Sequence, residues 1–274
     1  MAPPGYLYQR DFVTPDDAAA LAEWLGGLVP LWEMRFSTVR PLPPNEEQRR
    51  LLRPVYWLGN WQFACLGYYH PLKRRVGAAV RAEPFPPVLA RLAAAIQART
   101  RRLVSPHDVP KGWNLNTCLV NFYGASVVDG RETDVARVGS HADDEPGPVA
   151  SLSFGERALL QFVRRGRDSG GPVRSEWLED RSLQVFAGAW KDQVLHRVQR
   201  VEDKRGLDLP PRVDCWRTRR INLTLRYVPG ADLVPLSRLS PAALDDVRGY
   251  VRTLAAGSAW WASEARAAGV SLSG

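Results

Sequence analysis

Hydrophobic residues recur at the three- and four-residue spacing of an α-helix in two stretches of the chain. The stretch Thr14–Leu28 begins with a residue that can cap a helix, and Pro15 and two aspartates follow before alanine and leucine dominate. The stretch Pro87–Arg101 places its apolar residues on one stripe: Val88, Leu89, Leu92, Ala95 and Ile96. We predict a helix in each, and a third over Ala242–Ala256, which follows Pro241.

After Pro110 the apolar residues gather instead into short runs. Clusters of glycine, proline and charged residues, as at Arg164–Pro172 and Asp203–Pro211, separate these runs. The predicted strands are Asn116–Tyr123, Val149–Phe154, Ala158–Val163, Ser182–Phe186, Val194–Val201 and Arg220–Val228. Successive strands without helices between them favour a mainly β fold with flanking helices, either a sandwich or a jelly roll.

This change of pattern divides the chain into three parts. Residues 1–113 hold two helices and the mixed stretch Val29–Tyr69, residues 114–229 hold the β core, and residues 230–274 form a helical extension. The chain has 274 residues, of which 45% are hydrophobic, so it can bury a substantial core. We expect the three parts to form one compact unit.

Composition favours a cytoplasmic protein without membrane association. No run of about 18 apolar residues occurs, and the N-terminus lacks the basic start and apolar stretch of a secretory signal. The three cysteines, Cys65, Cys118 and Cys215, have no Cys-x-x-Cys spacing. Their scatter favours reduced thiols over a disulfide framework or a zinc ribbon.

The chain is basic, with a formal net charge of +8, and only four of its 37 basic residues are lysines. Positive charge favours phosphate-bearing partners through long-range attraction and counterion release. Arginine richness can equally reflect genome composition. Charge alone therefore decides little about the partner, and the sequence does not indicate the oligomeric state.

One His-x-Asp pair has the spacing of metal ligands. On an extended backbone the side chains of His141 and Asp143 share one face and can reach one ion. Of the other histidines, His70 and His107 stand beside prolines, whereas His196 lies in a predicted strand. Two histidines and one carboxylate leave three coordination positions open, which suits Fe(II) oxygen chemistry. Taken alone, such a pair is more often a surface turn, and a His-Asp-His set could also hold zinc.

The stretch Arg220–Arg226 alternates strictly between polar and apolar residues. An amphipathic strand of this kind usually turns its polar face to water, but in a two-layered β fold that face can line an interior pocket. The two arginines, roughly 20 Å apart along the strand, could then hold a small dicarboxylate from both sides, because guanidinium pairs bidentately with carboxylates. Asn121 and Tyr123 could donate hydrogen bonds to the same dicarboxylate or could face solvent.

Together these segments resemble the AlkB family in order and approximate spacing. The matching segments are Asn121-Phe-Tyr123, His141-Ala-Asp143-Asp-Glu145-Pro, Val149-Ala-Ser-Leu-Ser-Phe-Gly155, Leu195-His196-Arg-Val and Arg220-Ile-Asn-Leu-Thr-Leu-Arg226. The resemblance is strong over about residues 114–228 and holds only in outline over residues 1–113. It is closest to the branch with His-x-Asp-Asp-Glu-Pro followed by Ala-Ser-Leu-Ser-Phe-Gly, which includes nucleic-acid dealkylases.

The resemblance implies a double-stranded β-helix (jelly roll) that works as an Fe(II)- and 2-oxoglutarate-dependent dioxygenase. Carried over by position, Fe(II) would be bound by His141, Asp143 and His196. The co-substrate 2-oxoglutarate would be held by Asn121, Tyr123, Arg220, Asn222 and Arg226. O2 is the second co-substrate, and the implied products are succinate, carbon dioxide and an aldehyde released from a hydroxylated N-alkyl group. The paired arginines have no role in a zinc hydrolase and are not required in a cupin.

The implied substrate is an alkylated base of DNA or RNA, unpaired or flipped out of its stack. The resemblance places a substrate lid before the jelly roll and aligns Glu145 with a position that contacts the base or an active-site arginine. Trp57, Trp61 and Tyr69 are candidate stacking platforms, and Arg167 is a candidate phosphate contact. Packing of the aromatic residues in the core and a solvated basic turn are the plainer interpretations.

Three functions stay open. The His-x-Asp-Asp-Glu motif and the positive charge favour a nucleic-acid demethylase. The added stretch Lys204–Arg217, the extension after Pro229 and the loose match of residues 1–113 favour an oxygenase of a small molecule or a protein side chain. A nucleic-acid-binding module with a vestigial metal motif is the third.

Overall fold

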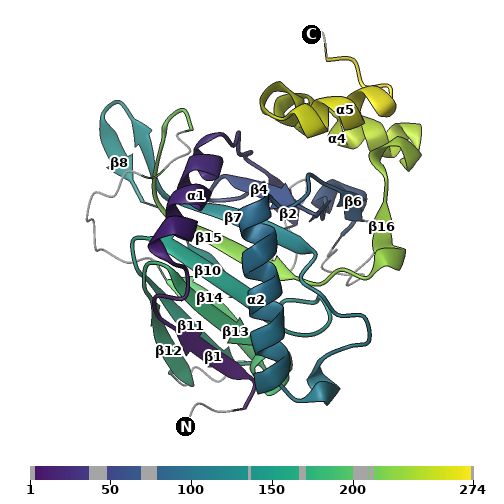
Figure 1. Cartoon of the computed structure of the whole chain (residues 1–274). Helices are drawn as coiled ribbons and strands as arrows, with labels where there is room; N and C mark the ends of the chain where they lie inside the picture. The colour runs from purple at the N-terminus through teal and green to yellow at the C-terminus, as the bar shows by residue number, and fades with distance from the viewer. Residues whose placement is uncertain are drawn as a thin grey trace.

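Two antiparallel β-sheets form the centre of the computed structural model, which describes residues 4–36, 48–68, 79–134, 137–166, 171–199, 209 and 213–272 (Figure 1). The larger sheet has the order β1-β13-β10-β15-β7-β4, with β8 paired to β7, and the smaller sheet has the order β12-β11-β14-β9. The strands of the larger sheet are β1 Tyr6–Gln9, β4 Val55–Leu58, β7 Thr117–Val128, β8 Arg131–Thr133, β10 Val149–Gly155, β13 Ser182–Phe186 and β15 Trp216–Arg226. Those of the smaller sheet are β9 Val138–His141, β11 Ala158–Arg164, β12 Arg174–Leu178 and β14 Val194–Gln199. The predicted jelly roll is confirmed.

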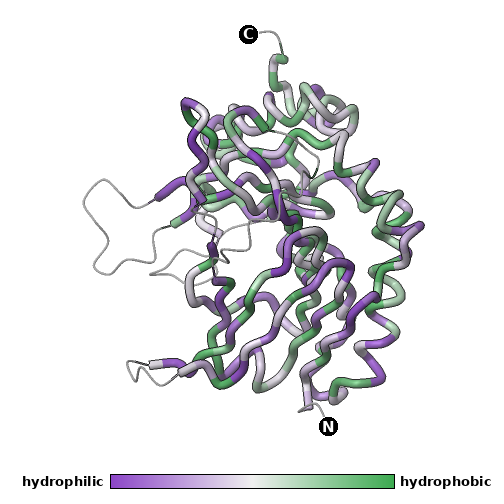
Figure 2. Tube along the Cα trace, turned by 90° about the vertical axis from the view of Figure 1, so that its left-hand side faces the viewer, coloured by the Kyte–Doolittle hydropathy of each residue, from purple (hydrophilic) through white to green (hydrophobic). Residues whose placement is uncertain are grey.

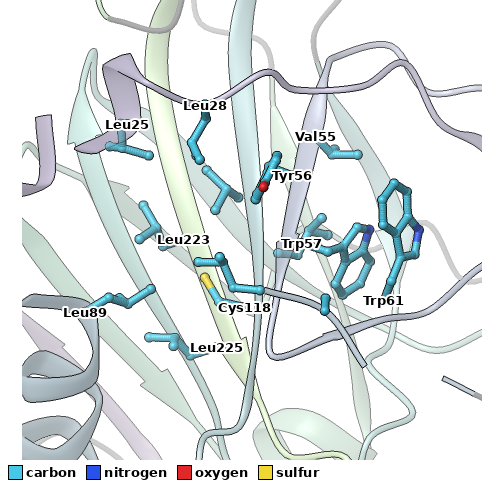
Figure 3. Packing of buried hydrophobic residues seen from close by; sticks show 14 of the residues in the cluster. Leu25, Leu28, Val55, Tyr56, Trp57, Trp61, Leu89, Cys118, Leu223 and Leu225 are labelled. Carbon is cyan, nitrogen blue, oxygen red and sulfur yellow. The ribbon is translucent and has the colours of Figure 1, made fainter. Parts of the chain in front are cut away.

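Helices α1 (Pro15–Gly26) and α2 (Pro87–Leu103) cover the outer face of the larger sheet (Figure 1). The side chain of Thr14 accepts a hydrogen bond from the backbone N–H of Asp17 at 3.1 Å and caps α1, as its position in the sequence predicts. Leu25 and Leu89 face Leu223 and Cys118 of the sheet across this interface (Figure 3). The main hydrophobic core therefore lies between the helices and the larger sheet.

Strand alternation gives the larger sheet an apolar outer face and a polar inner face. In β15, Ile221, Leu223 and Leu225 belong to the outer core, while the alternate residues point between the sheets. The alternation of polar and apolar residues along the strands is visible in Figure 2. Part of the space between the sheets is filled by a second apolar cluster built from both: Tyr6, Val149, Leu160, Phe162, Leu178 and Phe186. The rest is the cavity described below.

A bulge in β15 fixes which arginine enters that space. Thr218 pairs with Gly124 and Arg220 with Tyr123, so Arg219 is the extra residue. Its buried guanidinium contacts Asp134 and lies 3.2 Å from Glu156, outside the cavity. After the bulge, the alternation of side chains along β15 directs Arg220 toward the inner face of the sheet.

Short elements flank both ends of the sheets. The turn η2 (Pro106–Asp108) and helix α3 (Ala189–Asp192) lie together at the end that holds the first residues of the chain. At the other end are the β2–β3 hairpin (Met34–Phe36 and Gln48–Arg50), a sheet of β5 (Asn60–Trp61), β6 (Ala79–Arg81) and β16 (Leu233–Val234), and the turns η1 Ala64–Leu66, η3 Gly230–Asp232 and η4 Leu236–Arg238. The C-terminal helices α4 (Pro241–Gly257) and α5 (Ala259–Ala267) pack here. Trp261 is buried against Trp61, with ring centroids 5.8 Å apart, and the hydroxyl of Tyr250 accepts a hydrogen bond from the backbone N–H of Met34 at 3.0 Å. The extension thus braces the first hairpin strand.

Most predicted elements appear within a few residues of their predicted bounds, and the differences lie in weakly patterned stretches. The strands β1, β9 and β12 and helix α5 are additional to the prediction. Most of the Lys204–Arg217 stretch lies outside the described residues. The three cysteines are free thiols, and no helix in the described ranges has the length and apolar character to cross a membrane.

Candidate active site

A cavity of about 890 Å³ opens between the two sheets. One wall is the polar inner face of the larger sheet, contributed by β7, β10, β13 and β15. The opposite wall comes from β9, β11 and β14 of the smaller sheet. One end is closed by residues of the β2–β3 hairpin, of the stretch between β3 and β4, and of the stretch around η1. The polar face of Arg220–Arg226 therefore lines an interior pocket rather than facing water.

Two histidines and an aspartate meet on the wall formed by the smaller sheet. His141 at the end of β9 pairs in register with His196 of β14, and their ring centroids are 4.1 Å apart. Asp143 follows two residues later, and its Oδ2 lies 3.5 Å from His196 Nε2. One ligand atom from each of the three residues lies within 4.8 Å of the others. The structure thus brings together the three predicted metal ligands.

Asp143 is held in its ionised form. Burial alone would raise its pKa, but the charge of Arg226, whose Nη2 lies 2.6 Å from Asp143 Oδ1, and the nearby histidines lower the pKa to about 2. The other oxygen, Oδ2, is buried and has no hydrogen-bond donor among the described residues. A buried carboxylate oxygen of this kind fits a cation.

Both histidines are set to present a free ring nitrogen. Burial, with the neighbouring His141 as the next cause, lowers the pKa of His196 to about 3, so its imidazole is neutral. The Nδ1 of His141 lies 2.9 Å from the carbonyl oxygen of Gly139, which can only accept a hydrogen bond. In the neutral ring Nδ1 therefore carries the proton, which leaves Nε2 as the nitrogen that can bind a metal. The three residues fit a divalent metal with open coordination positions.

The larger sheet carries the residues predicted to hold a dicarboxylate. Arg220 donates through Nη2 to Ser153 Oγ at 3.0 Å, and its guanidinium carbon lies 4.8 Å from the centre of the Tyr123 ring. Burial lowers the pKa of Arg220, and its Nε and Nη1 have no hydrogen-bond partner in the described part of the chain. A buried guanidinium with unpaired donors on a cavity wall fits a carboxylate ligand.

Asn222 and Asn121 stand beside this arginine in a fixed orientation. They face each other across β15 and β7, and Asn222 donates to Ser151 Oγ and to the carbonyl of Leu152. Arg226 lines the same cavity, but its guanidinium contacts Asp143 and lies 3.7 Å from Glu145. The two predicted arginines therefore differ in role: Arg220 offers free donors, and Arg226 stands at the metal cluster.

Arg53 is a cavity residue that no sequence pattern indicated. Its Nε donates to Asn121 Oδ1 at 2.8 Å, and its guanidinium carbon lies 5.0 Å from the centre of the Tyr123 ring. It thus holds two side chains of the predicted cradle. Because it belongs to the irregular stretch before β4, no alternation or spacing could have found it.

The substrate residues predicted from the sequence lie deeper than expected. The indole N–H groups of Trp57 and Trp61 donate to the buried carboxylate of Glu33 at 3.0 and 3.1 Å, and each residue is only 1% exposed. Trp57 still lines the cavity. Trp61 does not: its ring stacks on Phe63 at 4.3 Å, so the prediction that it stacks on a base is wrong.

The remaining predicted substrate residues are Glu145, Tyr69 and Arg167. Glu145 is buried, is not part of the cavity wall, and accepts a hydrogen bond from the amide of Gln62 at 2.7 Å. Of its two predicted contacts, the structure shows the one to an arginine, Arg226. Tyr69 and Arg167 lie outside the described residues.

Comparisons with known proteins agree with this arrangement. A family model described as "2OG-Fe(II) oxygenase superfamily" matches residues 5–226. Among solved structures, "The structure of OsALKBH1" matches with a TM-score of 0.52 and 21% sequence identity, covering 83% of this chain and 100% of that chain. At this identity the likeness concerns the fold alone. No curated protein matches the chain significantly.

Proposed function

The chain belongs to the 2OG-Fe(II) oxygenase superfamily, and we propose that it removes alkyl groups oxidatively from nitrogen atoms of DNA or RNA bases. Membership makes it a dioxygenase that uses Fe(II), 2-oxoglutarate and O2. The AlkB-like resemblance of its motifs agrees with the family match and with the fold of the OsALKBH1 structure.

In this proposal His141, Asp143 and His196 hold Fe(II). The free donors of Arg220 bind one carboxylate of 2-oxoglutarate, beside Asn121, Tyr123 and Asn222. Arg226 keeps Asp143 ionised and lines the same cavity. When bound, iron with 2-oxoglutarate and O2 supplies the oxidation of a substrate C–H bond, with release of succinate and carbon dioxide. The side chains supply orientation and a site shielded from water.

One observation supports a nucleic-acid substrate above others: exposed arginines line the mouth of the same cavity that contains the metal cluster. They are Arg49 and Arg50 of β3 and Arg137 before β9. Exposed arginines bind phosphate oxygens while a base enters a pocket. The volume of about 890 Å³ is in the usual range for ligand pockets.

Succinate formation in the presence of defined oligonucleotides tests the proposal. We expect 1-methyladenine or 3-methylcytosine in an oligonucleotide to stimulate turnover over the unmethylated oligonucleotide, and the stimulation to weaken as salt rises. The variants Arg50→Gln and Arg137→Gln should raise the KM for the oligonucleotide with little change in kcat. Absence of stimulation by either methylated base contradicts the proposal.

A second candidate is an oxygenase of a small molecule or a protein side chain. The observation that favours it is the enclosure of Trp57 and Trp61, which leaves fewer aromatic faces for a base. Turnover stimulated by a metabolite or peptide and not by methylated oligonucleotide would select it. His141→Ala and Asp143→Ala test the vestigial alternative, since Fe(II) binding that is lost in both variants excludes it.

A further inference from the structure

Gln62 lies on the wall of the cavity that contains the metal cluster. Gln62 follows β5, is 1% exposed, and lines the cavity. Its backbone carbonyl accepts a hydrogen bond from Arg35 Nη1 at 2.7 Å, which fixes the main chain there. Contacts connect its side chain through Glu145 and Arg226 to Asp143. Gln62 therefore lines the same cavity as the metal cluster and is linked to one of the predicted metal ligands through two side chains.

The orientation of this amide is determined by its neighbours. Nε2 donates to Glu145 Oε1 at 2.7 Å and lies 3.4 Å from the hydroxyl of Tyr68. Because a carboxylate accepts and cannot donate, the nitrogen must face Glu145 and the oxygen must face away. The Oε1 of Gln62 is buried and has no hydrogen-bond donor among the described residues.

Glu145 accepts the hydrogen bond of the amide on the side away from the cavity. It is buried outside the cavity wall, so Gln62 stands between its charge and the cavity. An amide whose N–H groups donate to an anion becomes a stronger acceptor at its oxygen. A ligand that carries an N–H group would satisfy this oxygen, whereas a carbonyl would place two acceptors against each other.

We propose that Gln62 Oε1 accepts a hydrogen bond from an N–H group next to the alkylated nitrogen of the substrate. Gln62 is thus a specificity-determining residue, and Glu145 is a positioning residue that acts through it. The preferred substrate carries an amino group beside the alkylated ring nitrogen, and a ring with a carbonyl in that place is disfavoured. This inference rests on the proposed function, because it needs an alkylated ring as the substrate.

Two methylated pyrimidines provide the test, since 3-methylcytosine carries an amino group where 3-methylthymine carries a carbonyl. The measurement is kcat/KM for each base in otherwise identical single-stranded oligonucleotides. We expect the wild-type protein to prefer 3-methylcytosine, and Gln62→Met to reduce the ratio of the two kcat/KM values by about tenfold or more. The kcat/KM for 3-methylcytosine should decrease, and the kcat/KM for 3-methylthymine should stay nearly unchanged.

Two further variants separate recognition from folding. Gln62→Glu retains an acceptor oxygen, with one proton shared between the two carboxyl groups, and should keep the preference for 3-methylcytosine. Gln161→Leu removes an amide from β11, outside the cavity wall, and should leave the ratio unchanged. Thermal unfolding of each variant shows whether it is folded.

The possible outcomes are distinguishable. A wild-type preference that collapses in Gln62→Met and survives in Gln62→Glu supports the inference. Turnover of both bases with the same ratio in wild type and Gln62→Met overturns the inference and leaves the proposed function standing. Absence of turnover with both bases in the wild-type protein removes the proposed function and the inference with it.

Discussion

Arg226 lies 2.6 Å from one carboxylate oxygen of Asp143, and the other oxygen of Asp143 points at His196. Both residues of this ion pair are buried. The pair therefore holds Asp143, one of the predicted metal ligands, in place. It also keeps the pKa of Asp143 near 2, although burial alone would raise this pKa. A buried pair of this kind is costly to break by removal of one partner only.

We predict that Arg226→Gln lowers the free energy of unfolding of the metal-free protein at pH 7 by about 3 kcal/mol. The ionised carboxylate then remains buried without its cation, so its pKa rises. In the wild type the stabilisation by Asp143 is fully present above about pH 4 and is lost as the pH falls toward 2. The deficit of the variant should shrink on acidification, because protonation removes the buried charge.

Urea denaturation between pH 4 and pH 7 measures this effect. The double variant Arg226→Gln/Asp143→Asn is the control, because it removes the unpaired charge and should recover most of the lost stability. A deficit in Arg226→Gln that is the same at every pH, or that the second substitution leaves unchanged, would contradict the role given to the pair.

The free donors of Arg220 give a prediction for co-substrate binding. Arg220→Lys keeps the positive charge but loses the planar fork, so the Kd for 2-oxoglutarate should rise by about tenfold or more. Ser153→Ala removes the partner of Nη2 and should raise the Kd less. Anaerobic titration with Mn(II) in place of iron measures binding without turnover.

Arg157→Lys is the matched control for Arg220→Lys. Arg157 lies in the turn after β10, with its guanidinium 4.4 Å from the Trp177 ring and outside the cavity wall. Its substitution should leave the Kd for 2-oxoglutarate unchanged. An equal Kd in wild type and Arg220→Lys would remove Arg220 from the cradle.

The predictable parts of this site follow from strand periodicity. The strict alternation of Arg220–Arg226 predicts both a strand and a shared face for its polar residues, and the structure confirms both. When two sheets pack together, an inner face either carries apolar side chains that fill the space or lines a cavity. The inner face of this strand is polar, so it lines a cavity. The His-x-Asp spacing works in the same way, because it needs only an extended backbone.

The parts that the sequence could not predict depend on contacts between distant segments. The amide of Gln62 meets Glu145 across 83 positions of the chain, and no local pattern encodes such a contact. The placement of Trp57 and Trp61 was missed for a related reason. Their burial depends on Glu33, a carboxylate that accepts both indole N–H groups, and a charged residue in an irregular stretch gives no sign of being buried.

Glu33 is therefore expected to be a structural residue of the substrate end of the cavity. Its carboxylate accepts from two indoles and lies 3.1 Å from Arg35, which in turn holds the backbone of Gln62. Glu33→Ala leaves buried donors without an acceptor and should lower the free energy of unfolding by about 3 kcal/mol. It should also raise the KM for substrate more than it changes the Kd for 2-oxoglutarate.

Chemical denaturation and the two binding measurements check this prediction together. Glu23→Ala on the exposed face of α1 is the control, because this glutamate is exposed and should affect none of the three quantities. If Glu33→Ala matches wild type in stability, the carboxylate is not the acceptor that holds the two tryptophans.

Gly124 provides a test of the bulge that directs Arg220 into the cavity. A Cβ at this position would lie 1.8 Å from the carbonyl oxygen of Arg217, on the neighbouring strand β15. Because the Cβ would be bonded directly to the backbone of β7 and the oxygen belongs to the backbone of β15, the clash can be relieved only by moving the strands apart. We expect Gly124→Ala to lower the free energy of unfolding by about 3 kcal/mol.

The same displacement should reach the co-substrate site, since the register changes between Thr218 and Arg220 beside this glycine. Gly124→Ala should therefore weaken 2-oxoglutarate binding even under conditions where the variant is folded. Gly249→Ala is the matched control: this glycine lies within α4, and a Cβ there meets no atom within 4 Å. It should raise stability by about 0.5–1 kcal/mol through helix propensity and leave the Kd unchanged. A folded Gly124→Ala variant that binds 2-oxoglutarate as the wild type does would show that the bulge does not control the position of Arg220.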